Sequence, residues 1–344
     1  MEVIDSNIYK TLIQESDSDG AEITQATKKG RTRSWFIFLK KIMPWAAAVI
    51  LLSYLFYYID IKAFLTALLK ADPGAYFFWL ITFGITAFVL DVQNLRYLFL
   101  KFNYDVPLRK LFNIRGVSYL AMIVNYTIGI GSISLFLKRD AGIPLFRSAS
   151  ILLVYNSATQ NCLAFLTAVG FLFYQVPSTI ADSVFIISIS IFSVSIVIIS
   201  VLKYLNGNGK LDRFTALEIV KVFYELPWKS YILITFWRCI YYLSFLVFFY
   251  FAVRAFNMDI PIAAIVVYVP MILLIISLPV APFGLGTSQG AMILFFKDYG
   301  SESTIFAFSI AYSTSIIIVR GLIGLLFLSN IPEWFLNIKT TKGE

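Results

Sequence analysis

The sequence contains no histidine and only two cysteines among its 344 residues. Histidine and cysteine are the usual nitrogen and sulfur ligands of zinc and iron, and histidine is the most common general base. Their scarcity argues against most metalloenzymes and hydrolases, so we expect no metal, no cofactor and no enzymatic activity. Cys162 and Cys239 each lie inside an apolar stretch, where a thiol behaves as a small hydrophobic group, and we expect no structural disulfide.

Charged residues are also scarce, at 14% of the chain, whereas 59% of the residues are hydrophobic and the mean hydropathy is +0.80. A water-soluble globule of this length would not need so many apolar side chains for its core. Most of the apolar surface must therefore face lipid, which predicts a multi-pass protein of the inner (cytoplasmic) membrane. The net charge of +8 does not indicate nucleic-acid binding, because the basic residues lie between apolar segments and not on one basic face.

Eight apolar segments follow a polar N-terminal stretch. Their approximate bounds are 43–61, 75–100, 111–137, 148–174, 183–202, 230–254, 263–296 and 303–328. Stretches of roughly 18 or more apolar residues are typical of membrane-spanning helices. We predict a disordered cytoplasmic tail at 1–34, a transmembrane domain at 35–332 and a short cytoplasmic tail at 333–344.

Two of the eight segments are interrupted by residues that disfavour a continuous helix. The first break holds Asn125, Gly129, Gly131 and Ser132, and the second holds Pro282, Gly284, Gly286, Thr287, Ser288 and Gln289. Hydrocarbon cannot satisfy the backbone groups that such breaks release, so they persist only where protein or a water-filled cavity surrounds them. Broken segments at matching positions of two halves are a sign of a transport site near the membrane midplane.

The distribution of basic residues indicates whether the broken segments cross the membrane. The flank from Lys28 to Lys41 places the start of the first segment in the cytoplasm. If all eight segments crossed, the basic loop 203–229 would lie outside and the loop 175–182, without Lys or Arg, would lie inside, against the positive-inside rule. We therefore predict an all-α membrane protein with six transmembrane helices and two re-entrant broken helical hairpins, arranged as inverted repeats, with both termini in the cytoplasm.

The second broken segment resembles that of a known family, the flippase-like membrane domain of lysylphosphatidylglycerol synthases and their stand-alone relatives. The resemblance rests on Leu278-Pro279-Val280-Ala281-Pro282-Phe283-Gly284-Leu285-Gly286-Thr287-Ser288-Gln289, on a later membrane arginine, Arg320, and on the first break with its basic loop from Lys138 to Gly142. Gln289 stands where the family has Glu, so a carboxylate that could carry a proton is absent there. The aminoacyl-transferase domain of the bifunctional members is also absent from this sequence. The resemblance thus implies movement or handling of a lipid, and not its synthesis.

Three charged residues inside apolar segments are the first candidates for a substrate-binding site, because charges within the bilayer are rare and usually functional. Asp91, Arg238 and Arg320 lie at similar distances from the cytoplasmic ends of their segments. One carboxylate facing two guanidinium groups leaves one positive charge to attract a phosphate. Alternatively, Asp91 pairs with one arginine for structural reasons, while the other extends towards the membrane surface.

Polar groups at the two breaks and in segment 148–174 complete the predicted substrate-binding set. The break residues named above, from Asn125 to Ser132 and from Pro282 to Gln289, would present backbone N–H groups and hydroxyls to an anion. Asn156 and Gln160 would line a polar track. The glycines are also consistent with close packing of the hairpins, and the two amide side chains with hydrogen bonds between helices.

The leading functional hypothesis is a flippase or transporter that moves a lipid, or a lipid-linked anionic or glycosylated headgroup, across the bilayer. The alternatives are a secondary transporter of a small organic anion and a non-transporting membrane scaffold for a lipid-modifying enzyme. The expected partners are membrane lipids, with such an enzyme added in the scaffold alternative, and no nucleic acid. The sequence leaves open the substrate, the direction of transport, the energy coupling and the oligomeric state, including a homodimer.

Overall fold

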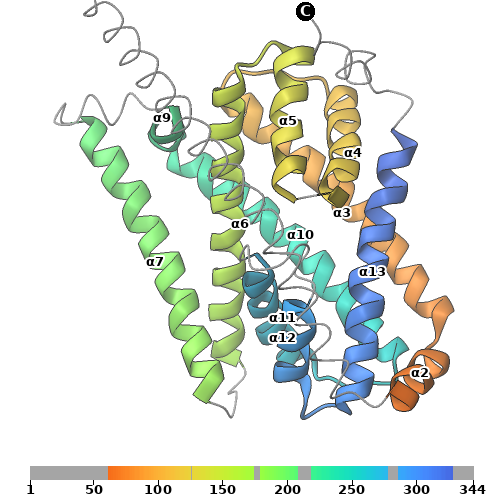
Figure 1. Ribbon diagram of the computed structural model, residues 1–344. Helices are drawn as coiled ribbons and strands as arrows, with labels where there is room; N and C mark the ends of the chain where they lie inside the picture. Colours follow the sequence, from red (N-terminus) through yellow and green to blue (C-terminus); the bar gives the residue numbers. More distant parts are fainter. Residues whose placement is uncertain (1–60, 125, 174–178, 208–217, 278–285, 328–344) are drawn as a thin grey trace, which may run out of the picture.

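The computed structural model describes residues 61–124, 126–173, 179–207, 218–277 and 286–327, which form helices and contain no strand. The helices are α2 (Ile61–Lys70), α3 (Pro73–Lys101), α4 (Leu108–Val124), α5 (Tyr126–Ala141), α6 (Leu145–Phe173), α7 (Thr179–Gly207), α9 (Glu218–Glu225), α10 (Trp228–Ala255), α11 (Ile262–Ser277), α12 (Thr287–Phe296) and α13 (Glu302–Leu326) (Figure 1). The predicted first crossing at 43–61 lies almost wholly outside the described residues, as do both predicted tails.

Four of the described helices are long and apolar enough to cross a membrane, namely α3, residues Phe185–Tyr204 of α7, α10 and α13. These helices match four of the predicted apolar segments to within a few residues. Helix α6 is as long as α3, at 29 residues, but polar side chains between Asn156 and Asn161 interrupt its apolar sequence, and it is not among the four. The prediction of a helical, multi-pass membrane protein is therefore confirmed.

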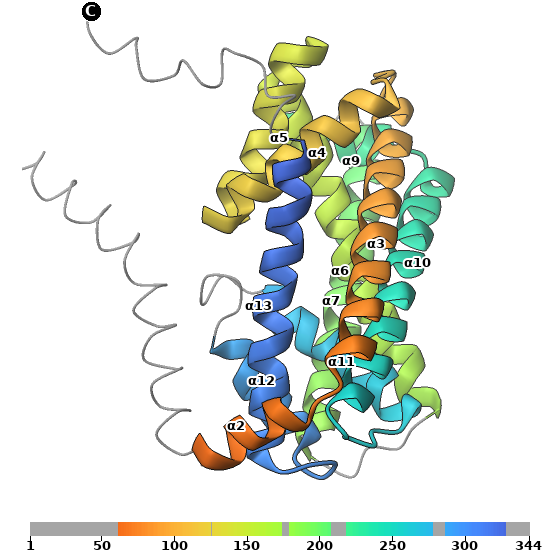
Figure 2. The ribbon, with the colours of Figure 1, turned by 90° about the vertical axis from the view of Figure 1, so that its right-hand side faces the viewer.

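The two interrupted segments form pairs of short helices. Helices α4 and α5 contain 17 and 16 residues, and α11 and α12 contain 16 and 10. At 1.5 Å per residue, each is shorter than about 26 Å, less than the roughly 30 Å of hydrocarbon in a bilayer. The first pair lies at one end of the molecule and the second pair lies at the opposite end (Figures 1 and 2). We call α4–α5 the first hairpin and α11–α12 the second hairpin.

Helices α3 and α10 begin and end alike. A proline lies at the start of each helix: Pro73 is the first residue of α3, and Pro227 is the N-cap residue of α10. Each ends at the same motif, which reads Phe102-Asn103-Tyr104-Asp105-Val106-Pro107 after α3 and Phe256-Asn257-Met258-Asp259-Ile260-Pro261 after α10. The asparagines adopt positive φ angles of 62° and 57°, as C-terminal cap residues often do. The first hairpin follows one copy of the motif and the second hairpin follows the other.

The helices around the hairpins also pack in matching pairs. Helices α3 and α10 run antiparallel, because the Asp72 amide donates to the Ala255 carbonyl at 2.8 Å and the Asn94 side chain donates to the Ile234 carbonyl at 3.5 Å. Helix α13 packs against α4, and α6 packs against α11. Glycines allow both close approaches: a Cβ at Gly324 would lie 2.5 Å from Leu120, and one at Gly170 would lie 2.9 Å from Val267.

Buried apolar side chains form two separate cores. The first core surrounds the first hairpin and includes the C-terminal part of α3 and the start of α10. The second core surrounds the second hairpin and includes the N-terminal part of α3 and the end of α10. The boundary between the cores falls near Phe88 in α3 and between Ile234 and Phe245 in α10. Asp91 and Arg238 therefore lie where the two apolar cores meet.

Candidate functional site

A buried ionic cluster lies at the boundary between the two cores, centred on Asp91 of α3. This side chain is 3% exposed. Its Oδ1 atom accepts hydrogen bonds from Arg238 Nη1 at 2.9 Å and from the Tyr155 hydroxyl, and its Oδ2 atom accepts from Arg115 Nε at 2.5 Å. Helices α3, α4, α6 and α10 therefore meet at one carboxylate.

Arg238 of α10 is enclosed by three tyrosines. Its guanidinium carbon lies 4.6, 4.5 and 5.2 Å from the ring centroids of Tyr155, Tyr241 and Tyr242, within the range of cation–π attraction. It donates to the hydroxyls of Tyr155 at 2.5 Å and Tyr242 at 3.3 Å. The Arg238 Nε atom is buried and has no hydrogen-bond partner within the described residues.

Tyr119 of α4 links this cluster to a third arginine, Arg320 of α13. The guanidinium carbons of Arg115 and Arg320 lie 5.1 and 5.9 Å from the centroid of the Tyr119 ring. Arg320 lines a cavity of about 120 Å³ whose wall also includes Tyr119, Tyr241, Tyr242, Leu273 and Tyr312. Tyr119 and Tyr242 contact both the ionic cluster and the cavity, so the cavity adjoins the cluster. It is bordered by both hairpins, through Tyr119 of α4 and Leu273 of α11.

Among the described residues, the cluster and the cavity together hold one carboxylate and three guanidinium groups. Charges within the bilayer are rare and usually functional, so a group of three arginines is suited to an anionic ligand. Guanidinium groups stay protonated and bind phosphate through two parallel hydrogen bonds. In the part of the chain that the structure describes, no three Cys, Asp or Glu side chains are grouped as metal ligands. The arrangement is suited to holding an anion in place.

The predicted residues of the second break lie elsewhere, at the start of α12. Ser288 and Gln289 are 1% and 0% exposed. Gln289 Oε1 accepts from the Gly286 amide at 2.7 Å and from the Ser288 hydroxyl at 2.9 Å, and Gln289 Nε2 donates to Ser313 of α13 at 3.2 Å. Gly286 has a φ of 85°, and Thr287 is the first residue of α12. These contacts fix α12 to α13, and none of these residues lines the cavity beside Arg320.

The predicted residues of the first break lie within α5, because the break is shorter than the sequence predicts. Helix α5 begins at Tyr126 and contains Gly129, Gly131 and Ser132. A Cβ at Gly129 would lie 2.9 Å from backbone atoms of Met122, so this glycine permits close packing of α5 on α4. Ser132 donates to the Gly129 carbonyl at 2.7 Å. Asn125, Pro282 and Gly284 lie outside the described residues.

The polar residues of α6 form bonds between helices. Gln160 accepts a hydrogen bond from Ser277 of α11 at 3.4 Å. Asn161 donates to Tyr231 of α10 at 2.7 Å and to Ser195 of α7 at 2.9 Å. Asn156 is half-buried. The structure therefore favours interhelical bonding over a polar track for Gln160.

Sequence reasoning missed Arg115, Tyr119 and Tyr155, although it placed Asp91 and Arg238 in the site. Arg115 is the eighth residue of α4, a depth comparable to that used to select Asp91 and Arg320. The same test of charge within an apolar segment would have found it. The two tyrosines carry no such signal, because tyrosine is common in this chain, at 20 residues.

A family model described as the lysylphosphatidylglycerol synthase TM region matches residues 42–324. This range covers most of the chain and contains every residue of the ionic cluster and Arg320. No curated protein and no solved structure matches the chain.

Proposed function

Because the chain belongs to the lysylphosphatidylglycerol synthase TM region family, we propose that it moves a lipid with an anionic headgroup between the two leaflets of the membrane. The family name connects this membrane domain to a lipid. The observation that carries the proposal is the grouping of Arg115, Arg238 and Arg320 at Asp91 and at an adjoining cavity that both hairpins border. The cluster is assigned a binding role and no catalytic chemistry.

In this proposal, the headgroup phosphate exchanges places with the Asp91 carboxylate. The phosphate first meets Arg320 in the cavity, and then competes with Asp91 for Arg115 and Arg238. A phosphodiester has two non-bridging oxygens, so it can accept from both arginines as the two oxygens of Asp91 do. Arg115 belongs to the first hairpin and Asp91 belongs to α3, so binding of the phosphate would release α4 from α3. Recognition of the substrate is thereby coupled to movement of the hairpin.

The proposed architecture has six transmembrane helices and two hairpins that enter the membrane from opposite faces, as inverted repeats. Four observations support it: the short hairpin helices, their positions at opposite ends, the motif repeated after α3 and α10, and the matching contacts of α13 with α4 and α6 with α11. Transporters built this way bind substrate near the midplane, where the repeats meet.

We propose that the end holding the first hairpin faces the cytoplasm, together with both termini. That end carries many basic residues, including Lys101, Arg109, Lys110, Lys138, Arg139 and Arg147. The opposite end carries Asp72, Asp259, Asp298 and Glu302 beside fewer basic residues. Lysine and arginine are enriched on the cytoplasmic side of membrane proteins.

The small size of the cavity favours a second candidate, a transporter of a small organic anion. At about 120 Å³, it is below the roughly 300–1,000 Å³ of typical ligand pockets. A lipid flippase needs room there only for the headgroup, because the acyl chains stay in the bilayer. Uptake of soluble anions into vesicles, measured beside lipid movement, separates the two candidates.

The proposed function is tested with the purified full chain in liposomes that contain a fluorescent anionic phospholipid. Dithionite quenching reports the fraction of labelled lipid in the outer leaflet over time. We expect protein-dependent lipid movement, and we expect Arg320→Gln to slow it at least about tenfold, because a charge-assisted contact is lost. Arg254→Gln is the matched control, since Arg254 lies at the end of α10 and pairs with the exposed Asp259.

Two results would contradict the proposal. If lipid moves at the same rate in liposomes with and without the protein, the proposed function is wrong. Equal rates for Arg320→Gln, Arg254→Gln and the unmodified chain would show that the cluster does not take part.

A further inference from the structure

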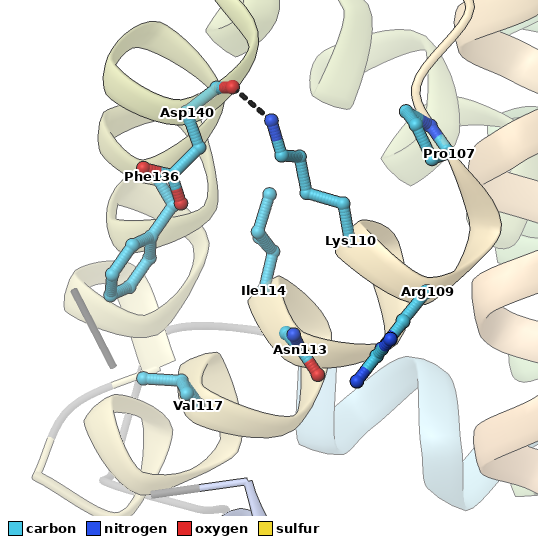
Figure 3. Close-up of a pocket in the computed structure, with 8 residues that line it drawn as sticks. All are labelled: Pro107, Arg109, Lys110, Asn113, Ile114, Val117, Phe136 and Asp140. Atoms are coloured by element: carbon cyan, nitrogen blue, oxygen red, sulfur yellow. Dashed lines mark hydrogen bonds between the residues drawn. The ribbon is translucent and has the colours of Figure 1, made fainter. Parts of the chain in front are cut away.

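A second cavity, larger than the one beside Arg320, lies between the two helices of the first hairpin. Its volume is about 370 Å³, within the roughly 300–1,000 Å³ that is typical of ligand pockets. It is lined by Pro107, Arg109, Lys110, Asn113, Ile114, Val117, Phe136 and Asp140 (Figure 3). It shares no lining residue with the cavity beside Arg320. This second cavity is therefore not part of the site formed by the ionic cluster and Arg320.

The lining changes from charged to apolar along α4. Arg109 and Lys110 lie in the first turn of α4, Asn113 lies one turn further, and Ile114 and Val117 lie deeper. Residues three and four apart share one face of a helix, so Lys110, Asn113, Ile114 and Val117 follow a single stripe. Ile114, Val117 and Phe136 are buried, whereas Arg109 is exposed. The cavity thus has a cationic mouth and an apolar floor.

The charges at the mouth match a ligand with one negative charge. Arg109 and Lys110 contribute two positive charges, and Asp140 at the end of α5 contributes one negative charge. Figure 3 shows Lys110 reaching across from α4 to α5, where its ammonium group donates to the Asp140 carbonyl. The Arg109 guanidinium, in the first turn of α4, is the group at the mouth best suited to a phosphodiester.

We propose that this cavity, which we name the hairpin pocket, binds the headgroup of an anionic glycerophospholipid at the membrane surface. The phosphodiester lies against Arg109 and Lys110, the glycerol backbone lies near Asn113, and the first methylenes contact Ile114, Val117 and Phe136. The order of these groups along α4 is the order along a phospholipid, from charged headgroup to acyl chain. The cavity does not have room for two acyl chains, which stay in the bilayer. The site is separate from the transport site, and its occupancy is measurable without any transport.

The test is photo-crosslinking of the full chain in phosphatidylcholine vesicles that contain a photoactivatable phosphatidylglycerol. We expect labelled peptides to come from the hairpin pocket, namely the one that holds Asn113 and the one that holds Phe136. The double variant Arg109→Gln/Lys110→Gln should reduce this labelling at least about tenfold, since both charge-assisted contacts are lost. Asn113→Trp should reduce it similarly, because the larger side chain fills the cavity without changing the charge.

The matched control is Lys138→Gln/Arg139→Gln, which removes two positive charges from the last turn of α5. Both residues are exposed and neither lines the cavity, so labelling should persist in this variant. Equal losses in the two double variants would mean that surface charge alone attracts the lipid, and the proposal would be wrong.

A competition experiment tests whether the pocket binds a lipid or a free phosphate compound. Excess glycerol 3-phosphate or inorganic phosphate should leave the labelling unchanged, because neither has acyl chains to contact the apolar floor. Abolition of labelling by either compound would overturn the assignment to a lipid. Unchanged labelling in Asn113→Trp would overturn it too, and this variant keeps the test decisive if Arg109→Gln/Lys110→Gln fails to fold.

Discussion

The two hairpins occupy similar positions in the packing but differ in chemistry. The first hairpin is tied to the scaffold by charge, through Arg115 and Asp91, and encloses a pocket with a cationic mouth. The second hairpin is held by neutral contacts of Gln289 with Gly286, Ser288 and Ser313. In the proposed repeat, the two hairpins therefore carry different functional groups. The proposed recognition of an anion accordingly falls to the first hairpin.

Removal of Asp91 should have the largest effect on stability and should act mainly on the first hairpin. Asp91→Ala leaves Arg115 and Arg238 without their buried carboxylate, and loss of one partner of a buried ion pair destabilises by roughly 3–5 kcal/mol. Thermal unfolding in detergent measures the loss. Hydrogen exchange should increase in α4 and α5 more than in α11 and α12.

Asp259→Ala is the control for this prediction, because Asp259 forms an ion pair with Arg254 at the surface. Such exposed pairs contribute roughly 0–1 kcal/mol. Similar losses of stability in the two variants, or hydrogen exchange that increases equally in both hairpins, would show that Asp91 does not act on the first hairpin in particular.

Removal of Gln289 should have the next largest effect, and should act on the second hairpin. Gln289→Ala leaves the buried Gly286 amide and the Ser288 hydroxyl without their shared acceptor, which costs about 1–3 kcal/mol. Hydrogen exchange should increase in α12 and the facing part of α13, with α4 unchanged. Gly290→Ala is the control in the same helix, since its new Cβ would meet nothing within 4 Å.

An effect of similar size, but confined to one contact, should separate two glycines of the first hairpin that look equivalent in the sequence. Gly129→Ala should destabilise by about 1–3 kcal/mol, because the new Cβ would be forced against the backbone of Met122. Gly131→Ala should be neutral or slightly stabilising, because its Cβ would meet nothing within 4 Å and alanine favours helix. Circular dichroism melts of both variants provide the measurement. Equal destabilisation would show that both glycines have the same role.

Much of the helical framework was predictable from the sequence, because the length of an apolar stretch is a local property. The bounds of α3, α10 and α13 follow the predicted segments closely. The repeated motif after α3 and α10 was also visible in the sequence, but it lies in polar loops and a search among apolar strings and glycines passes over it. Its two copies are a stronger sign of duplication than the glycine motifs, because both place an asparagine at positive φ.

The ionic cluster was predictable only in part, because its contacts join distant parts of the chain. Asp91 is 24 residues from Arg115, 64 from Tyr155 and 147 from Arg238. An apolar pattern shows that a charge is buried but does not show which partner it meets. For the same reason the sequence did not show that Gln289 bonds to Gly286, Ser288 and Ser313.

The smallest effect is expected from a cross-link in the scaffold that the two hairpins share. The sulfur atoms of Cys162 in α6 and Cys239 in α10 lie 3.0 Å apart, so a disulfide needs an approach of only about 1 Å. Diamide, a membrane-permeant oxidant, accepts the two electrons and two protons released when the two thiols join. We expect it to remove both alkylatable thiols, as measured by mass spectrometry, without changing the rate of lipid movement. Helices α6 and α10 supply Tyr155 and Arg238 to the same Asp91 oxygen, and in the proposed function the hairpins move while this scaffold stays fixed. Cys162→Ser, treated with diamide in the same way, is the control. If oxidation stops transport only in the unmodified chain, and a reductant restores it, the motion lies between α6 and α10 and not in the hairpins.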